Sequence, residues 1–189
     1  MGRVIVTEFV SVDGVMEAPG GEPGYRHTGW TIGYPFTPEQ GTFKLNEVFE
    51  ADAHLLGRKT YESFAGAWPD RDDPEGFAAR MNSMPKYVVS TTLKQLDWTN
   101  SHLISGNVPD EIVRLKEEVG DLLVAGSRSL VHTLYEHDLV DEYRLMVFPV
   151  VLGSGRRVFP DDAENKRPLE LVATQSFSNG VAVQTFRRG

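Results

Sequence analysis

The chain has 189 residues, of which 40% are hydrophobic and 24% charged, and this balance is typical of a globular domain long enough to bury its own core. The formal net charge of -8 and the lack of a Lys/Arg-rich run argue against a nucleic-acid partner. The absence of cysteine excludes disulfides, zinc–thiolate sites and a cysteine nucleophile, and favours a cytoplasmic location. No apolar stretch is long enough to span a bilayer, so no membrane association is expected.

The N-terminal part of the chain predicts a strand, a long loop and a helix. Residues 3–10 are rich in β-branched side chains and predict the strand. Residues 16–35 contain five Gly and three Pro and predict a loop, which at that length is usually functional or mobile. Thr37, Pro38 and Gln40 form the pattern of a helix start, with an N-cap, a proline at the first position and a capping box.

The later elements alternate in the same way and predict the fold class. Helices between strands indicate a mostly parallel sheet, so the chain is expected to be one α/β domain of residues 1–189. Asn179-Gly180 between two apolar runs predicts a C-terminal hairpin, which makes the sheet mixed. Further strands are expected at residues 53–56, 86–90, 103–104, 121–125, 142–151, 169–177 and 181–186. Further helices are expected after Thr60 through Phe64, at residues 77–81, from Pro109 and after Ser127.

The first strand-to-helix turn has the residue types of a phosphate site. Gly57 allows a ligand to approach the backbone closely, and Arg58 and Lys59 supply positive charge. Thr60 adds a hydroxyl donor at a helix start, where free N–H groups favour anions. The alternative interpretation is a surface turn with a capping threonine, and the residue types alone leave both open.

The second strand-to-helix turn has the same design. Gly126 follows a buried strand and precedes a hydroxyl-rich helix start made by Ser127, Arg128 and Ser129. Ligands of open α/β sheets bind outside the carboxyl ends of the strands, where both turns are expected to lie. Two such turns in one parallel sheet therefore favour a shared binding site more strongly than either does alone.

Three further features are open to two interpretations. Ser90 and Thr91 place hydroxyls at a strand end, where a turn is the simpler interpretation. Asp13 follows the first strand, where its carboxylate either contacts the substrate or forms an Asx-turn before Gly14. The aromatic residues of the loop at residues 16–35 either cover a flat heterocycle or pack the loop onto the domain.

At this level of detail the sequence resembles the dihydrofolate-reductase-like superfamily. Residues 56–63, 85–91 and 125–127 look like the cofactor-binding motifs of that fold, in the same order. Residues 9–14 and 148–155 resemble the bacterial branch akin to the C-terminal reductase domain of riboflavin biosynthesis. The resemblance implies a three-layer α/β/α fold with a mixed, mostly parallel central sheet and a C-terminal antiparallel hairpin.

The resemblance also implies an activity and a cofactor. It implies an NADPH-dependent reductase that transfers a hydride to a small heterocyclic substrate, similar to 5-amino-6-(5-phosphoribosylamino)uracil reductase, and a homodimer. No metal is expected, because the five His residues show no metal-ligand spacing. Asp13 would be the catalytic residue. The cofactor would be bound by Gly57, Arg58, Lys59, Thr60, Ser90, Thr91, Gly126, Ser127, Arg128 and Ser129, and the substrate by Ser11, Trp30, Tyr61 and Trp68.

Two departures from the family pattern bear on the substrate. The acid that binds the pterin in dihydrofolate reductases falls near Gly41, which has no carboxylate, although Glu39 and Glu47 are close in sequence. The basic residues that would hold a ribosyl phosphate are not clearly matched in residues 68–71, where Arg71 is a possible substitute. The alternatives are therefore a dihydrofolate-reductase-type activity and a non-catalytic nucleotide-binding module on the same fold.

Overall fold

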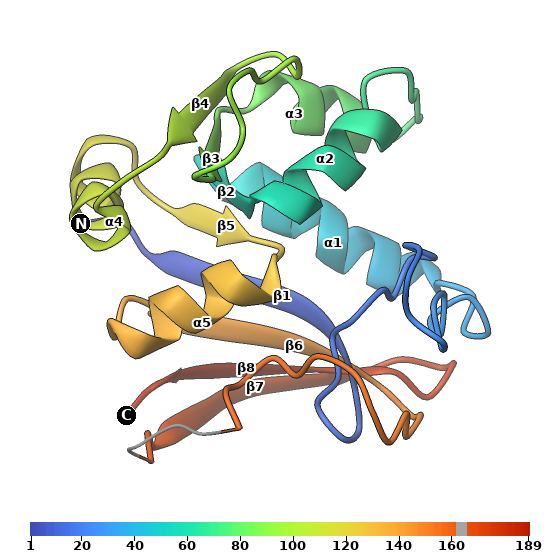
Figure 1. Cartoon of the computed structure of the whole chain (residues 1–189). Helices are drawn as coiled ribbons and strands as arrows, with labels where there is room; N and C mark the ends of the chain where they lie inside the picture. Colours follow the sequence, from blue (N-terminus) through green and yellow to red (C-terminus); the bar gives the residue numbers. More distant parts are fainter. Residues whose placement is uncertain (162–165) are drawn as a thin grey trace.

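The computed structural model describes residues 1–161 and 166–189, which fold around one eight-stranded sheet (Figure 1). The strands are β1 (Val4–Ser11), β2 (Ala53–Gly57), β3 (Lys86–Val89), β4 (Ser101–Ile104), β5 (Leu122–Val124), β6 (Glu142–Phe148), β7 (Leu169–Ser176) and β8 (Ala182–Arg188). Their order is β4-β3-β2-β5-β1-β6-β8-β7. In this order, all neighbouring strands in the span β4-β3-β2-β5-β1-β6 are parallel, whereas β8 is antiparallel to both β6 and β7.

Helices cover both faces of the sheet. One face carries α1 (Pro38–Glu50), α2 (Arg58–Ala67) and α3 (Phe77–Ser83), and the other carries α4 (Val108–Glu118) and α5 (Arg128–Glu136) (Figure 1). This arrangement confirms the predicted three-layer α/β/α fold, with a mixed, mostly parallel sheet and a C-terminal hairpin.

The central strand β1 divides its side chains between the two helical layers. Val4 and Val6 belong to the buried cluster that includes residues of α4 and α5, whereas Ile5 belongs to the cluster that includes residues of α1, α2 and α3. Thr7 continues toward α1, where its hydroxyl donates to Glu47 over 3.0 Å. Because side chains alternate along a strand, Glu8 lies on the side of α4 and α5.

The predicted start of α1 is present in full. The Thr37 hydroxyl accepts from the backbone N–H of Gln40, and the Gln40 side chain accepts from the N–H of Thr37, which completes the capping box. Asn179 at the tip of the C-terminal hairpin donates to the carbonyl of Pro35 at 3.0 Å and to the Gln40 side chain. The last hairpin therefore contacts the start of α1.

Some element boundaries differ from the predicted ones. The strand expected at residues 142–151 ends at Phe148, because Pro149 has no N–H for the ladder and the N–H of Val150 turns back to the Phe148 carbonyl at 2.7 Å. Helix α2 extends beyond Phe64 to Ala67. Among the described helices, none combines the length and the apolar character needed to cross a membrane.

Candidate functional site

Two strand-to-helix turns meet at the carboxyl end of the sheet. β2 enters α2 at Gly57, and β5 enters α5 through Gly126 and Ser127. Since β2 and β5 are parallel neighbours, the turns lie side by side. The N–H of Gly57 donates to the carbonyl of Gly126 at 3.1 Å, which joins the turns directly.

Both glycines are required by the closeness of this contact. A Cβ atom on Gly57 would lie 2.1 Å from the Ser127 hydroxyl oxygen and 2.9 Å from the Ser127 backbone nitrogen. A Cβ atom on Gly126 would lie 2.7 Å from the Thr60 hydroxyl oxygen, and Gly126 has a φ of 89° that side chains rarely allow. The sequence therefore uses glycine here so that two helix starts can share one site.

The two helix starts present groups that can bind an anion. The N-cap residues Gly57 and Ser127 make no side-chain cap hydrogen bond, so the N–H groups of both first turns lack a side-chain N-cap partner. Nε of Arg128 is buried and has no partner in the part of the chain that the structure describes. Lys59 and Thr60 line the same space as Arg128. The position is electrostatically suited to a phosphate group.

A large cleft opens from these turns. Its volume is about 1520 Å³. One part is bordered by the anion-binding turns, and another by apolar side chains of β1, the following loop and the segment before α1: Phe9, Met16, Ala18, Pro19 and Phe36. The rings of Phe9 and Phe36 meet edge to face with centroids 5.7 Å apart. The cleft thus combines a polar region with an apolar, aromatic region, as ligand sites commonly do.

Glu8 lines the cleft and is the most unusual charged residue in it. It is only 8% exposed, and its Oε1 has no hydrogen-bond partner among the described residues. Burial raises the pKa of this carboxyl to about 8, although the charge of Lys44 and the N–H of Gly126 partly oppose the shift. A carboxyl with a raised pKa inside a cleft is a candidate for proton transfer.

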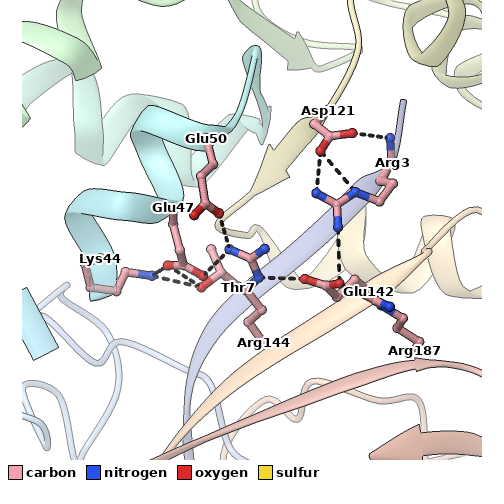
Figure 2. A network of polar contacts seen from close by, with 9 residues as sticks. All are labelled: Arg3, Thr7, Lys44, Glu47, Glu50, Asp121, Glu142, Arg144 and Arg187. Atoms are coloured by element: carbon pink, nitrogen blue, oxygen red, sulfur yellow. Dashed lines mark hydrogen bonds and ion pairs between the residues drawn. The ribbon is translucent and has the colours of Figure 1, made fainter. Parts of the chain in front are cut away.

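A network of polar and charged residues holds α1 against the sheet (Figure 2). Lys44 donates to the carboxylate of Glu47 and, over 2.8 Å, to the Thr7 hydroxyl. Arg144 lies 3.7 Å from Glu47 and donates to Glu142 at 2.7 Å. Since Glu47 is almost fully buried, these partners are needed to offset the loss of its hydration. The network fixes Lys44, which lines the cleft, with its Nζ 5.4 Å from the centre of the Phe9 ring.

The structure brings together only part of the predicted cofactor set. Lys59, Thr60, Gly126, Ser127 and Arg128 line the cleft, while Gly57 lies behind them against Ser127. The other four predicted cofactor contacts lie outside the lining, and three of them bond locally. The guanidinium of Arg58 pairs with Glu62, the hydroxyl of Ser129 lies 3.1 Å from that of Ser127, and the hydroxyl of Ser90 accepts from the N–H groups of Thr92 and Leu93, with Thr91 exposed beside it.

Of the four predicted substrate contacts, Trp68 lines the cleft. Tyr61 lies on the buried face of α2, where its hydroxyl accepts from the N–H of Trp98 at 3.0 Å. Trp30 packs edge to face on Phe148 and donates to the carbonyl of Glu17. For Trp30, packing of the loop therefore accounts for the aromatic residue.

Asp13 and Ser11 connect the end of β1 to the loop after β6 by hydrogen bonds. The Asp13 carboxylate accepts from the Ser11 hydroxyl at 2.7 Å and from the N–H groups of Leu152 and Gly153 at 3.1 and 2.8 Å. These hydrogen bonds, the one from Ser11 first, lower the pKa of Asp13 to about 2. Neither residue belongs to the cleft lining. The contacts favour the turn-forming interpretation of Asp13 over a role at the substrate.

Glu8 and Lys44 are cleft residues that the sequence reasoning did not select. The sequence does carry a signal for Glu8, because it is the one charged residue in a strand of mostly apolar and β-branched side chains. Lys44 gave no such signal, since lysines are common on helix surfaces and only its contact with β1 directs it into the cleft. Among the described residues no cluster of His, Asp or Glu is arranged to hold a metal ion.

Comparison with known families identifies the chain at this point. Residues 3–183 match the family described as the RibD C-terminal domain. The chain belongs to the RibD C-terminal domain family. The chain is also similar to YyaP of Bacillus subtilis (strain 168), with 34% identity over 184 residues, which cover 95% of this chain and 91% of YyaP.

Solved structures share the fold of this RibD C-terminal domain protein. A putative riboflavin biosynthesis protein from Shewanella sp. PV-4 has a TM-score of 0.78 with 22% identity, covering 99% of both chains. Dihydrofolate reductase from Enterococcus faecalis, complexed with NADP(H) and RAB-propyl, has a TM-score of 0.61 with 16% identity, covering 100% of this chain and 97% of that one. The family and the shared fold support an oxidoreductase of the riboflavin-reductase and dihydrofolate-reductase-like kind.

Proposed function

We propose that the protein is an NADPH-dependent reductase that transfers a hydride to a small heterocyclic substrate, in the manner of 5-amino-6-(5-phosphoribosylamino)uracil reductase. The observation that carries the proposal is the pair of joined glycine turns, Gly57 and Gly126, at the edge of a cleft that also has an aromatic region. A dinucleotide needs both, because its phosphates are anionic and its reactive ring is flat.

The residues at the turns fit the phosphates of such a cofactor. Arg128 would use its unpaired, buried Nε, and Lys59 and Thr60 would add a charge and a hydroxyl donor. The first-turn N–H groups of α2 and α5 would complete the site. When bound, NADPH supplies the hydride, and the protein supplies orientation and protons.

The aromatic part of the cleft fits flat rings. Phe9 and Phe36 form an edge-to-face pair that lines it, and Trp68 lines the cleft from the end of α2. Apolar side chains around a reacting ring exclude water, which protects a hydride donor from side reactions.

Dihydrofolate is a weaker candidate for the substrate. Gly41 lines the cleft from α1, so the expected position of a pterin-binding acid is on the cleft surface and has no carboxylate. A purely ligand-binding module is also less well supported, because burial raises the pKa of the Glu8 carboxyl next to the turns, which suits proton transfer.

The proposal is tested by titrating the purified protein with NADPH and NADH while following tryptophan fluorescence. We expect preferential binding of NADPH. Lys59→Ala removes a charge-assisted hydrogen bond of about 1–3 kcal/mol, so the NADPH dissociation constant should rise about tenfold. Arg58→Ala should have a smaller effect, because the Arg58 guanidinium already pairs with Glu62 and Arg58 is not part of the cleft lining.

Arg114→Ala on α4 is the control for a general loss of positive charge, since the partners of Arg114 among the described residues are Glu111 and Glu118 of the same exposed helix face. If NADPH and NADH both fail to bind the wild-type protein, the proposed function is wrong. If Lys59→Ala binds NADPH as the wild type does, the phosphates are not held where we propose.

A further inference from the structure

Glu8 lines the cleft beside one of the two glycine turns. In β1 it is followed by Phe9, which lines the aromatic region and whose side chain lies on the other face of the strand. On its other side is the Gly126 turn, because Glu8 Oε1 lies 3.8 Å from the point where a Cβ atom of Gly126 would be. A ligand whose phosphates occupy the turns therefore brings the group next to its phosphates toward Glu8.

The carboxyl of Glu8 lacks the partners that normally stabilise a buried charge. Glu47, which is also buried close to β1, has Lys44 and Arg144 beside it. Within the described part of the chain, no cation lies within ion-pair distance of Glu8. Its Oε1 is buried and unbonded, yet the residue lines the cleft, so a bound ligand can reach it.

These surroundings favour the uncharged acid. The charged groups that act on Glu8 are Lys44 and Glu47 of α1, which oppose each other, and burial outweighs both in raising its pKa. Lys59 of α2 and Arg128 of α5 also line the cleft. A phosphate bound between these two cations would offset their charge, so the bound ligand would favour the protonated form of Glu8 further.

We propose that Glu8 is the proton donor of the cleft, holding a proton on its carboxyl group until a substrate nitrogen or oxygen is placed against it. The inference rests on the proposed reductase function. The substrate carbon of a C=N or C=O bond receives the hydride, and its nitrogen or oxygen receives the Glu8 proton. The cofactor is thereby oxidised, the substrate is reduced by two electrons, and the Glu8 carboxylate recovers a proton from water. This is the role that a buried, neutral carboxylic acid performs in other enzymes.

The first arm of the test measures the proton directly. Protein labelled with ¹³C at the glutamate carboxyl groups is titrated by NMR in the absence of ligand, and the Glu8 resonance is assigned as the one missing from Glu8→Gln. Glu8→Asp provides a second assignment if Glu8→Gln does not fold. We expect a midpoint near 8 for Glu8. A midpoint in the range of ordinary exposed glutamates would overturn the proposal.

The second arm measures catalysis with aminouracil and pteridine acceptors, following oxidation of NADPH. Glu8→Gln should lower kcat by at least about a hundredfold, while the NADPH dissociation constant changes little. Glu8→Asp should recover part of the rate, and kcat of the wild type should fall as pH rises through the Glu8 midpoint. Glu117→Gln, at an exposed position on α4 outside the cleft lining, should leave the rate unchanged.

The outcomes separate the two proposals. A wild-type protein that does not bind NADPH refutes the proposed function, whatever the NMR titration shows for Glu8. A wild-type protein that binds and oxidises NADPH, with Glu8→Gln equally active, refutes only the role of Glu8. A flat pH profile in the wild type would refute it as well, because a residue with a merely structural role would not tie kcat to its own titration.

Discussion

Gly57→Ala should destabilise the protein although the backbone at this position suits any residue. Gly57 has a φ of -79° and a ψ of 159°, so alanine adds no backbone strain. The new methyl group would meet the Ser127 hydroxyl oxygen at 2.1 Å and the Ser127 backbone nitrogen at 2.9 Å. The hydroxyl can rotate away, but the backbone nitrogen belongs to the facing turn and moves only if that turn moves.

The expected cost follows from this clash. Forcing one extra methyl group into a packed site costs about 1–3 kcal/mol. Taking about 2 kcal/mol, and about 2–4 °C per kcal/mol for a chain of this size, Tm should fall by about 4–8 °C. The widened turns should also weaken NADPH binding. Gly57→Ala combined with Ser127→Ala should recover part of the loss, because it removes the nearer of the two clashing atoms.

Gly66→Ala in the same helix is the matched control. Gly66 is exposed, and apart from the backbone of its own helix no atom of the described residues lies within 4 Å of the place its Cβ would take. Alanine there should stabilise α2 by up to about 1 kcal/mol through its higher helix propensity. Both variants are compared with the wild type by thermal and urea unfolding. If they shift stability in the same direction, or if Gly57→Ala is neutral, the close contact between the turns is not what requires glycine.

Three other predictions concern burial, pH and assembly. Lys86 is fully buried, and its Nζ donates to three backbone carbonyls at 2.8–3.0 Å. Lys86→Met should therefore lower the free energy of unfolding in urea by about 3 kcal/mol, whereas Lys94→Met, at an exposed position, should change it little. Because the pKa of Glu8 is raised to about 8, its contribution to the free energy of unfolding is lost as pH rises from 4.5 to about 8. Buried His54, whose pKa is lowered to about 4, makes the free energy of unfolding rise with pH, but only below pH 6.5. The free energy of unfolding measured between pH 6.5 and 8 should therefore decline in the wild type, and Glu8→Gln should remove this decline. We further propose that two copies of the chain pair along the edge strand β7, where Leu171 is 53% exposed. Leu171→Lys should then convert a dimer to a monomer, as measured by light scattering. An unchanged mass would show that β7 is not the dimer interface.

The sequence predicted the fold well because local signals and tertiary packing agree in this chain. The capping box at Thr37 and the hairpin at Asn179-Gly180 are short-range patterns, and the structure contains both. The boundary error in β6 arose because an apolar run continues past Pro149, while the ladder needs N–H donors that this residue lacks.

The candidate site was predicted less completely, because its members come from distant parts of the chain. The glycine turns were found from their own residues, since a Gly before a hydroxyl-rich helix start is a local pattern. Glu8 and Lys44 are ordinary residues until β1, α1 and the Gly126 turn are brought together. Arg58 shows the converse, because its neighbours Lys59 and Thr60 line the cleft while its own side chain turns to Glu62.

The strand order has a consequence for how the cleft comes into being during synthesis. β1 is synthesised first, but its partners in the sheet are β5 and β6, which are synthesised much later. The Gly57 turn likewise cannot form its hydrogen bond to Gly126 until that residue has been synthesised. Until then β1 has no neighbours to pair with, and its apolar side chains remain uncovered. The ligand site can therefore assemble only after most of the chain has left the ribosome, and contacts of such long sequence separation favour slow folding.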